Sequence, residues 1–230
     1  MTLNAVVETF AQKMVRRPPD ISGRELAGVL TANDFLERVN RPEADPPRAR
    51  RVVVVGGGNV AMDAARSALR LGAELVTIVY RRGRAELPAC SGEIHEAELE
   101  GVQFVFLTSP IAIAGDDDGR VRSLRCARMV LGEADASGRP RSTPTGDEME
   151  IEADEVILAL GSRAEPWLAA SNPQLIVNGL AHPIVTDDCA TSLKGVYAGG
   201  DLVRGAATVV EAIADGLRAA EAIDGQLASH

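Results

Sequence analysis

Three consecutive glycines are the residues whose types and spacing most clearly indicate binding chemistry. The segment from Gly56 to Ala61 reads GGGNVA and fits the pattern GxGxxA. In that pattern the first glycine permits a tight turn from strand to helix, Gly58 lets a pyrophosphate approach the backbone, and Ala61 allows close packing of the helix on the strand. The helix start at Asn59 and Val60 would add free N–H groups and the positive end of a helix dipole. The alternative is a glycine-rich turn that binds nothing.

A group of arginines, Arg81, Arg82 and Arg84, stands about 25 residues after Gly56, where a dinucleotide-binding chain places the residue that reads the ribose. Sites for NAD usually carry Asp or Glu there, which accepts a hydrogen bond from the 2′-hydroxyl. An arginine fork instead matches a phosphate, so these residues predict the 2′-phosphate of NADP(H). The alternative is a solvated basic turn, which the position directly after a strand disfavours.

The elements that would position these residues form a strand–helix–strand unit. Val52–Val55 is a continuous apolar run, as in a strand buried on both faces in a parallel sheet. Apolar residues then recur at helical spacing up to Gly72, which sits where a C-cap glycine is expected, and Leu75–Tyr80 forms the second strand. Two parallel strands joined by a helix make a right-handed βαβ unit, which is the context that a phosphate-binding glycine turn requires.

The rest of the chain divides around this unit. Residues 1–50 are an approach segment and linker, with a helix expected at Leu30–Asn40 and Asn33 as its cap. Residues 51–152 are the dinucleotide-binding domain, which ends in an antiparallel wing of three β-prone runs, Val102–Leu107, Val121–Leu131 and Glu148–Ile151. Residues 153–230 contain two strands that end in glycine-rich turns and a long final helix, at Ala153–Gly161, Lys194–Asp201 and Thr208–Ile223. The fold class is α/β, a Rossmann-like three-layer domain with a β wing and a further α/β segment.

Composition and charge exclude several classes of partner. Aromatic residues make up 3% of the 230 residues and the net charge is −9, which disfavours base stacking and a nucleic-acid partner. Three cysteines, Cys90, Cys126 and Cys189, stand far apart without a CxxC pair, so we expect no disulfide framework, no metal site and no iron–sulfur cluster on this chain. No apolar stretch is long enough to span a membrane. We therefore expect reduced thiols, a cytoplasmic location and no membrane partner.

Several of these motifs together resemble one known family. The segment VVVVGGGNVAMDAARSALRLGAELVTIVYRRGRAELPA, with ADEVILALGSRAEP and TSLKGVYAGGDLVRGAATVVEAIADGLRAA further on, resembles the glutamate synthase small (beta) subunit and its relatives. That family includes the NADPH-facing flavoprotein subunits of ferredoxin–NADP transhydrogenases and the N-terminal region of dihydropyrimidine dehydrogenase. The resemblance covers the chain from about Asp20 to Ile223. It implies an NADPH domain inserted into an FAD domain, and an oxidoreductase that passes hydride from NADPH to FAD.

The resemblance also implies roles for residues in the last part of the chain. Gly161 would lie near bound NADPH, and Asp201 would hold the ribityl chain of the flavin. Gly200 and the helix start at Thr208 and Val209 would face the isoalloxazine end or the pyrophosphate of FAD. A Gly-Gly-Asp turn before a helix suits this role, because it combines close backbone approach, a hydroxyl acceptor and a positive dipole. The alternative for Asp201 is an Asx turn or a helix cap.

Two parts of the family pattern are missing from the sequence. A second GxGxxG, which the first βαβ unit of the FAD domain carries for the ADP half, does not occur, and the cysteine-rich iron–sulfur region is absent too. FAD binding would therefore need missing N-terminal sequence or a partner. That partner would be a chain or domain carrying the ADP-binding half and the iron–sulfur clusters, or a second copy of this chain. Otherwise apolar surface would stay exposed, at Ile157–Leu160, at Val196–Ala198 and on the side of the last helix that carries Val209, Ala212, Ile213, Leu217 and Ala220.

No group of residues indicates side-chain catalysis. The sequence has no G-x-S-x-G, no HExxH and no Tyr-x-x-x-Lys. Hydride transfer between nicotinamide and flavin needs oriented cofactors rather than a side-chain acid or base, so no catalytic residue is assigned. The sequence predicts the NADPH-binding component of a flavoprotein oxidoreductase, incomplete on this chain alone. The alternatives are an NADP(H)-binding module that holds no flavin and catalyses nothing, and a structural remnant that only contacts partners.

Overall fold

The structure is a computed structural model that describes residues 21–41, 49–134, 138–161, 167–205 and 207–228. The chain divides into two compact units, of which the first lies within Pro18–Leu160 and the second begins at Gly161. Most of the linker expected before residue 51 lies outside the described residues. Each unit is described by itself.

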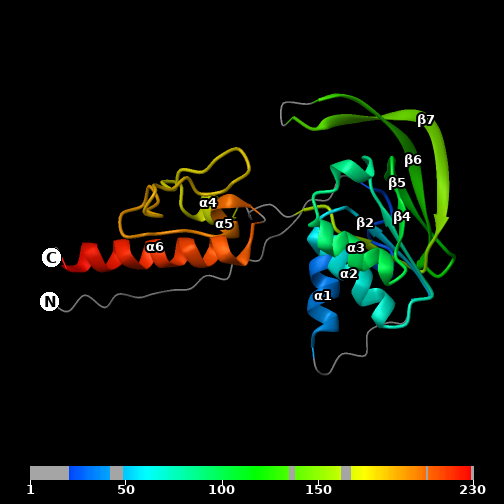
Figure 1. Ribbon diagram of the computed structural model, residues 1–230, viewed down its shortest axis with the longest axis horizontal. Coiled ribbons are helices and arrows are strands. Elements are labelled where there is room, and N and C mark those ends of the chain that lie inside the picture. Colours follow the sequence, from blue (N-terminus) through cyan, green and yellow to red (C-terminus); the bar gives the residue numbers. More distant parts are fainter. Residues whose placement is uncertain (1–20, 42–48, 135–137, 162–166, 206, 229–230) are drawn as a thin grey trace. The chain divides into compact units, whose positions relative to one another are not determined.

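A five-stranded parallel sheet forms the centre of the first unit (Figure 1). Its strands lie in the order β1 (Val29–Thr31), β8 (Glu155–Leu158), β2 (Arg51–Val55), β3 (Leu75–Val79) and β4 (Gln103–Val105). Because all neighbouring pairs are parallel, the carboxyl ends of the strands share one edge of the sheet. That edge is where open α/β sheets place their ligands.

The sheet is covered on both faces, which makes three layers. One face carries the helices α1 (Ala32–Val39), α2 (Asn59–Arg70) and α3 (Ser91–Leu99). The other face carries the wing, an antiparallel sheet of β5 (Thr108–Gly115), β6 (Val121–Ala134) and β7 (Pro140–Glu152). A short 3₁₀ turn at Arg84–Glu86 lies between β3 and α3.

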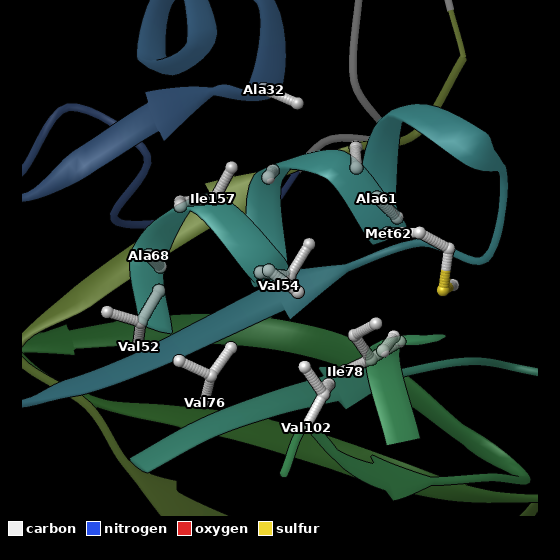
Figure 2. Close-up of a cluster of buried hydrophobic side chains, with 14 of the residues drawn as sticks. Ala32, Val52, Val54, Ala61, Met62, Ala68, Val76, Ile78, Val102 and Ile157 are labelled. Carbon is white, nitrogen blue, oxygen red and sulfur yellow. The ribbon is translucent and has the colours of Figure 1, made fainter. Parts of the chain in front are cut away.

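The alternation of side chains along β2 explains why both faces are buried. Val52 and Val54 point into the helix-side core, and Val53 and Val55 point into the wing-side core. The helix-side core is shown in Figure 2, where the alanines of α2 lie close above the strands. Small side chains let a helix approach a sheet closely, so α2 brings its first turn down onto the end of β2.

The α/β fold class, the three layers and the β wing are confirmed, but the structure corrects the extent of the wing. The run expected as its first strand, Val102–Leu107, instead supplies β4, which pairs in parallel with β3 because α3 returns the chain across the sheet. The first strand of the wing is β5, and it pairs antiparallel with β6.

The return strand also differs from the expected division. β8 lies between β1 and β2, so it completes the sheet of the first unit, and the units divide after Leu160 rather than before residue 153. Ile157 and Leu158 are buried in that sheet, which corrects the expectation that this run would expose apolar surface. The helix α1 is capped by Thr31, whose Oγ1 accepts a hydrogen bond from the backbone of Asp34 at 3.1 Å. Asn33, the cap expected from the sequence, lies inside the helix.

The second unit contains two short helices, α4 (Trp167–Ser171) and α5 (Asp201–Arg204), and one long helix, α6 (Val209–Ala228). The expected strand at Lys194–Asp201 is wrong, because the segment forms only an isolated bridge between Tyr197 and Ala190. A strand needs a continuous ladder of hydrogen bonds to a neighbour. Within the described part of the second unit, no strand is present to provide that neighbour.

Helix α6 exposes most of the apolar side that, from the sequence, we expect to stay exposed when no partner covers it. Its buried and half-buried residues are small or polar, namely Ala212, Asp215, Ala219, Ala222 and Gln226. The large apolar residues are exposed instead, at 76% for Val209, 58% for Ile213 and 62% for Leu217. Within the described ranges, none of the helices combines the length and the apolar character that crossing a membrane requires.

One acidic residue is buried in the helix-side core without a hydrogen-bonding partner among the described residues. Glu155, the first residue of β8, is 3% exposed and lines a small apolar cavity with Phe35, Val52 and Ala68. Burial raises the pKa of this carboxyl to about 7, against a smaller opposing effect of Arg38. The folded protein therefore keeps the Glu155 proton at pH values where the unfolded chain has lost it.

This burial predicts that Glu155→Gln stabilises the protein, and increasingly so as the pH rises. Between the unfolded pKa and about pH 7 the native state binds more protons, so the Glu155 contribution falls with rising pH. The free energy of unfolding of the variant should exceed that of the parent by an amount that grows by about 2 kcal/mol between about pH 5.5 and pH 8. Urea unfolding of both proteins across this range measures it. A difference that is constant with pH would contradict the raised pKa.

Candidate functional site

The candidate nucleotide site lies at the carboxyl edge of the central sheet. Gly56 follows β2 directly, and Arg81 comes two residues after β3. Since β2 and β3 are paired parallel neighbours, the glycines and the arginines share this edge, as the sequence predicts. Gly161 comes three residues after β8 and has a φ of +84°. A Cβ atom at Gly161 would meet no other atom within 4 Å.

The fold requires glycine at residue 56, whether or not a ligand is bound. The φ of Gly56, +141°, is one that residues with a side chain rarely adopt. A Cβ atom there would lie 2.1 Å from the carbonyl oxygen of Ala159, the residue after β8. The amide of Gly56 also donates to the carbonyl oxygen of Val79 at 3.0 Å. The first glycine of the pattern thus holds the turn between the ends of β8 and β3.

Gly58, in contrast, faces open space. Its backbone is extended, with φ −87° and ψ 175°, and a Cβ atom there would meet nothing within 4 Å. It is the N-cap of α2, and no side chain caps that helix. Among the described residues no acceptor binds the N–H groups of Asn59 and Val60, while Ala61 is fully buried against the sheet. The result is an uncapped, positively polarised helix end open to an anion.

A connecting segment, Arg84–Cys90, fastens the glycine turn from the side, and we call it the strap. The amide of Ala89 donates to the carbonyl oxygen of Gly57 at 3.1 Å, and the amide of Cys90 donates to Oδ1 of Asn59 at 2.8 Å. A Cβ atom on Gly57 would clash at 2.7 Å with both Tyr80 and Leu87. The side chain of Asn59 therefore holds the strap, while its backbone N–H has no acceptor among the described residues.

The three arginines have three different environments. Arg81 is exposed and makes no ion pair or side-chain hydrogen bond with the residues that the structure describes. Arg82 is only 6% exposed, and its Nε donates to the carbonyl oxygen of Pro140 in the wing at 2.7 Å. Arg84 makes a forked ion pair with Glu98 of α3, with Nη2 and Oε2 2.9 Å apart. This pairing lowers the pKa of the Glu98 carboxyl.

Of the three, Arg81 is the one whose guanidinium is available to a ligand without breaking a contact in the structure. A phosphate bound by Arg84 would have to compete with Glu98, and Arg82 holds the wing. The sequence motif could not separate these roles, because Pro140 and Glu98 come from distant parts of the chain. The strap was also missed, and its one signal in the sequence is the proline-containing turn LPA directly after the arginines.

The second unit contains the Gly199–Gly200–Asp201 turn that the family resemblance assigns to flavin. Gly200 has φ +63° and caps α5, and its amide donates to Oδ2 of the buried Asp215 at 2.8 Å. Asp201 is exposed, and its Oδ1 accepts a hydrogen bond from the amide of Ala207 at 3.2 Å. This contact is neither an Asx turn nor a cap of α5, because Ala207 lies beyond the end of that helix, and it leaves Oδ2 of Asp201 for a further partner.

Thr208 and Glu211 form a capping box at the start of α6. The amide of Thr208 donates to Oε2 of Glu211 at 2.9 Å, and the amide of Glu211 donates to Oγ1 of Thr208 at 3.3 Å. The hydroxyl of Thr208 is thereby engaged. The backbone N–H groups of Val209 and Val210 have no acceptor within the described residues, so they remain for an anion.

Asp215 is the functional candidate that the sequence pattern did not indicate. It is 1% exposed and accepts hydrogen bonds from Gly200 and from Nε and Nη2 of Arg204, each at 2.8 Å, and it also pairs with Arg218. The hydrogen bond from Arg204, followed by that from Gly200, holds the pKa of Asp215 well below its usual range. It has no signal in the sequence, because α6 also carries the acidic residues Glu211, Glu221 and Asp224. Among the described residues, no cluster of three His, Cys, Asp or Glu side chains could hold a metal ion.

Known proteins share both the sequence and the fold. The chain is 45% identical over 200 residues to the NADP(+)-dependent formate dehydrogenase subunit beta of Moorella thermoacetica, which covers 86% of this chain and 28% of that protein. It is 41% identical over 179 residues to the glutamate synthase [NADPH] small chain of Escherichia coli, covering 76% and 38%. The structure of Mycobacterium tuberculosis FprA in complex with NADPH shares the fold with a TM-score of 0.72 at 23% identity, over 95% of this chain and 63% of that one.

These relatives confirm the resemblance to the glutamate synthase small subunit, and their names are those of NADPH-dependent oxidoreductases. The chain spans between 28% and 50% of the length of the curated relatives that it matches. The family described as pyridine nucleotide-disulphide oxidoreductase matches residues 14–216. The chain therefore belongs to the pyridine nucleotide-disulphide oxidoreductase family.

Proposed function

We propose that this chain is the NADPH-binding component of a flavoprotein oxidoreductase and passes hydride from NADPH to FAD. The observation that carries the NADPH assignment is the pairing of two features on one sheet edge. Gly58 opens an uncapped helix end to a pyrophosphate, and Arg81, on the neighbouring strand end, has a guanidinium available for the 2′-phosphate.

In this function the chain binds and orients, and the cofactors supply the hydride chemistry. The N–H groups of Asn59 and Val60 would hold the pyrophosphate, with Gly56 keeping the turn closed and Ala61 seating the helix. Arg81 would hold the 2′-phosphate, with Arg82 and Arg84 supporting the basic turn from the wing and from α3. Gly161 would border the nicotinamide end.

For the flavin, the chain offers the turn at Gly200 and Asp201 and the start of α6. Oδ2 of Asp201 fits a hydroxyl of the ribityl chain, and the N–H groups of Val209 and Val210 beside Thr208 fit an anionic or electron-rich group. Val209, Ile213 and Leu217 of α6 are exposed, and this apolar surface is evidence that another protein surface packs over the helix. We propose that additional sequence, a partner chain or a second copy provides that surface together with the ADP-binding half of the flavin site.

The alternative is an NADP(H)-binding module without flavin. The observation that favours it is that both side chains already have partners within the chain: Asp201 accepts a hydrogen bond from the amide of Ala207, and Thr208 takes part in the capping box of α6. The two functions share the nucleotide site and differ in the flavin contact, so they are separated by experiments on the flavin alone.

Removing the available arginine tests the 2′-phosphate assignment. We expect Arg81→Ala to weaken NADPH binding by about 10- to 100-fold, because a charge-assisted pair with the phosphate is lost. NADH binding, which lacks that phosphate, should change by less than about threefold. Titration of both nucleotides by calorimetry measures the ratio.

The matched control is Arg50→Ala, which removes the same charge at the opposite edge of the sheet, where Arg50 pairs with Glu74. Its ratio of NADPH to NADH affinity should equal that of the parent. Equal losses of NADPH and NADH affinity in Arg81→Ala would rule out Arg81 as the ligand of the 2′-phosphate.

Replacing the first or the third of the three glycines by alanine should have different effects. Gly58→Ala leaves the fold intact within about 1 kcal/mol, because the added Cβ enters open space, but it weakens NADPH at least tenfold by keeping the pyrophosphate off the backbone. Gly56→Ala prevents normal folding, since its Cβ would meet the Ala159 carbonyl at 2.1 Å. Thermal unfolding and NADPH titration of both variants distinguish the roles. Unchanged NADPH affinity in Gly58→Ala would remove Gly58 from the binding site.

The flavin half of the function is tested with the purified chain and added FAD. Where a second copy of the chain completes the flavin site, FAD should bind, seen as increased polarisation of its fluorescence at high protein concentration, and NADPH should bleach the visible absorption of the bound flavin under anaerobic conditions. Binding should be weak, because the chain lacks a second phosphate-binding glycine turn. A chain that binds NADPH but leaves FAD unbound and oxidised would support the module without flavin.

A further inference from the structure

We infer that Asp215 is a positioning residue, which holds the Gly199–Gly200–Asp201 turn in its flavin-binding conformation before any flavin arrives. The inference rests on the proposed function, since it concerns the same flavin contact. Asp215 itself is buried on α6 and points at the turn rather than at a ligand. Its role would therefore be to act through Gly200.

Asp215 lies in close contact with the backbone of the Gly199–Gly200–Asp201 turn. A Cβ atom on Gly199 would lie 2.6 Å from Cβ of Asp215, and one on Gly200 would lie 3.3 Å from Cβ of Ala212. Both glycines thus make room for α6. The sequence suggests the Gly-Gly pair as a place where a ligand approaches the backbone closely. The packing of α6 against the pair is by itself a reason for glycine at both positions.

Hydrogen bonds then fix the orientation of the turn. Oδ2 of Asp215 accepts both the amide of Gly200 and Nε of Arg204, and Oδ1 accepts Nη2 of Arg204. Arg204 is the last residue of α5, and Gly200 is the residue that caps it. One carboxylate therefore holds both ends of α5, and Asp201, the residue between them that faces solvent, takes its direction from this arrangement.

A second contact holds α5 from another side. Nδ1 of the buried His182 lies 2.8 Å from the carbonyl oxygen of Leu202. A carbonyl only accepts, so His182 donates there. With Arg218 as an additional partner of Asp215, the carboxylate is surrounded by donors and stays charged. The turn is thus built entirely from residues of the second unit and needs no ligand to adopt its shape.

The hold of Asp215 on the Gly199–Gly200–Asp201 turn, which we call the clamp, can be tested without flavin through the amide of Gly200. Its hydrogen bond to Asp215 is buried, so hydrogen exchange of this amide should be slow in the flavin-free chain. In Asp215→Asn, loss of the charge-assisted pairs with Gly200 and Arg204 should raise the exchange rate at least about tenfold. NMR of glycine-labelled protein, or mass spectrometry of a peptide covering 196–205, measures it.

The consequence for flavin is measured by FAD titration of the same proteins. We expect Asp215→Asn to weaken FAD at least about tenfold and to leave NADPH affinity unchanged, because the nucleotide edge lies in the first unit. Arg204→Gln keeps the bond between Asp215 and Gly200 and should give a smaller loss. If Asp215→Asn loses the helix content of α6, the FAD affinity of Arg204→Gln tests the positioning role in its place.

The matched control is Gln226→Ala, which removes a hydrogen bond of 2.8 Å between Tyr197 and the far end of the same helix. It should leave both Gly200 exchange and FAD affinity as in the parent. An equal loss of FAD affinity in the control would show general loosening of α6 and overturn the positioning role. Unchanged exchange of Gly200 in Asp215→Asn, or faster exchange with unchanged FAD affinity, would overturn it as well.

Failure of the proposed function would look different. If the parent chain binds no FAD at any protein concentration while Gly200 is protected only when Asp215 is present, the positioning role of Asp215 stands and the proposal that this chain completes a flavin site alone or with a second copy fails. If FAD binds and Gly200 exchanges freely in the parent, the flavin site stands and the clamp fails.

Discussion

The close contact between Gly56 and the carbonyl of Ala159 is the constraint on which the nucleotide edge depends. With a Cβ distance of 2.1 Å, any side chain at residue 56 would push β2 and β8 apart at their carboxyl ends. The contact fixes the turn between three strands, because Gly56 also bonds to the end of β3. Gly57 can then lie under the strap and Gly58 can face outward, so one backbone arrangement gives three consecutive glycines three separate tasks.

The sequence predicted the parts of the fold whose signals are local. The apolar run of β2, the helical spacing of α2 and Gly72 after it define a βαβ unit with little help from the rest of the chain. β4 was assigned to the wrong sheet because a short apolar run looks alike in a parallel sheet and in a wing. The placement of β8 depends on a return across the whole wing, which no local pattern encodes.

The candidate site shows the same limit at the level of side chains. The motif YRRGR gave the position of the basic turn, but the separation of Arg81 from Arg82 and Arg84 arises from Pro140 and Glu98. In α6 the apolar pattern correctly indicated a side that this chain leaves exposed, at Leu217 among others, but it did not indicate that the helix packs through the buried Asp215. Periodicity shows that a helix has two faces, whereas the surface on which it packs decides which of them is covered.

The order of strands has a consequence for where the chain leaves the central sheet. β1 and β8 are adjacent and parallel, so the chain enters the central sheet at its amino edge and leaves it at its carboxyl edge. The exit at Leu160 therefore starts from the edge that carries Gly58 and Arg81. The segment that leaves the first unit therefore begins within a few residues of the nucleotide edge.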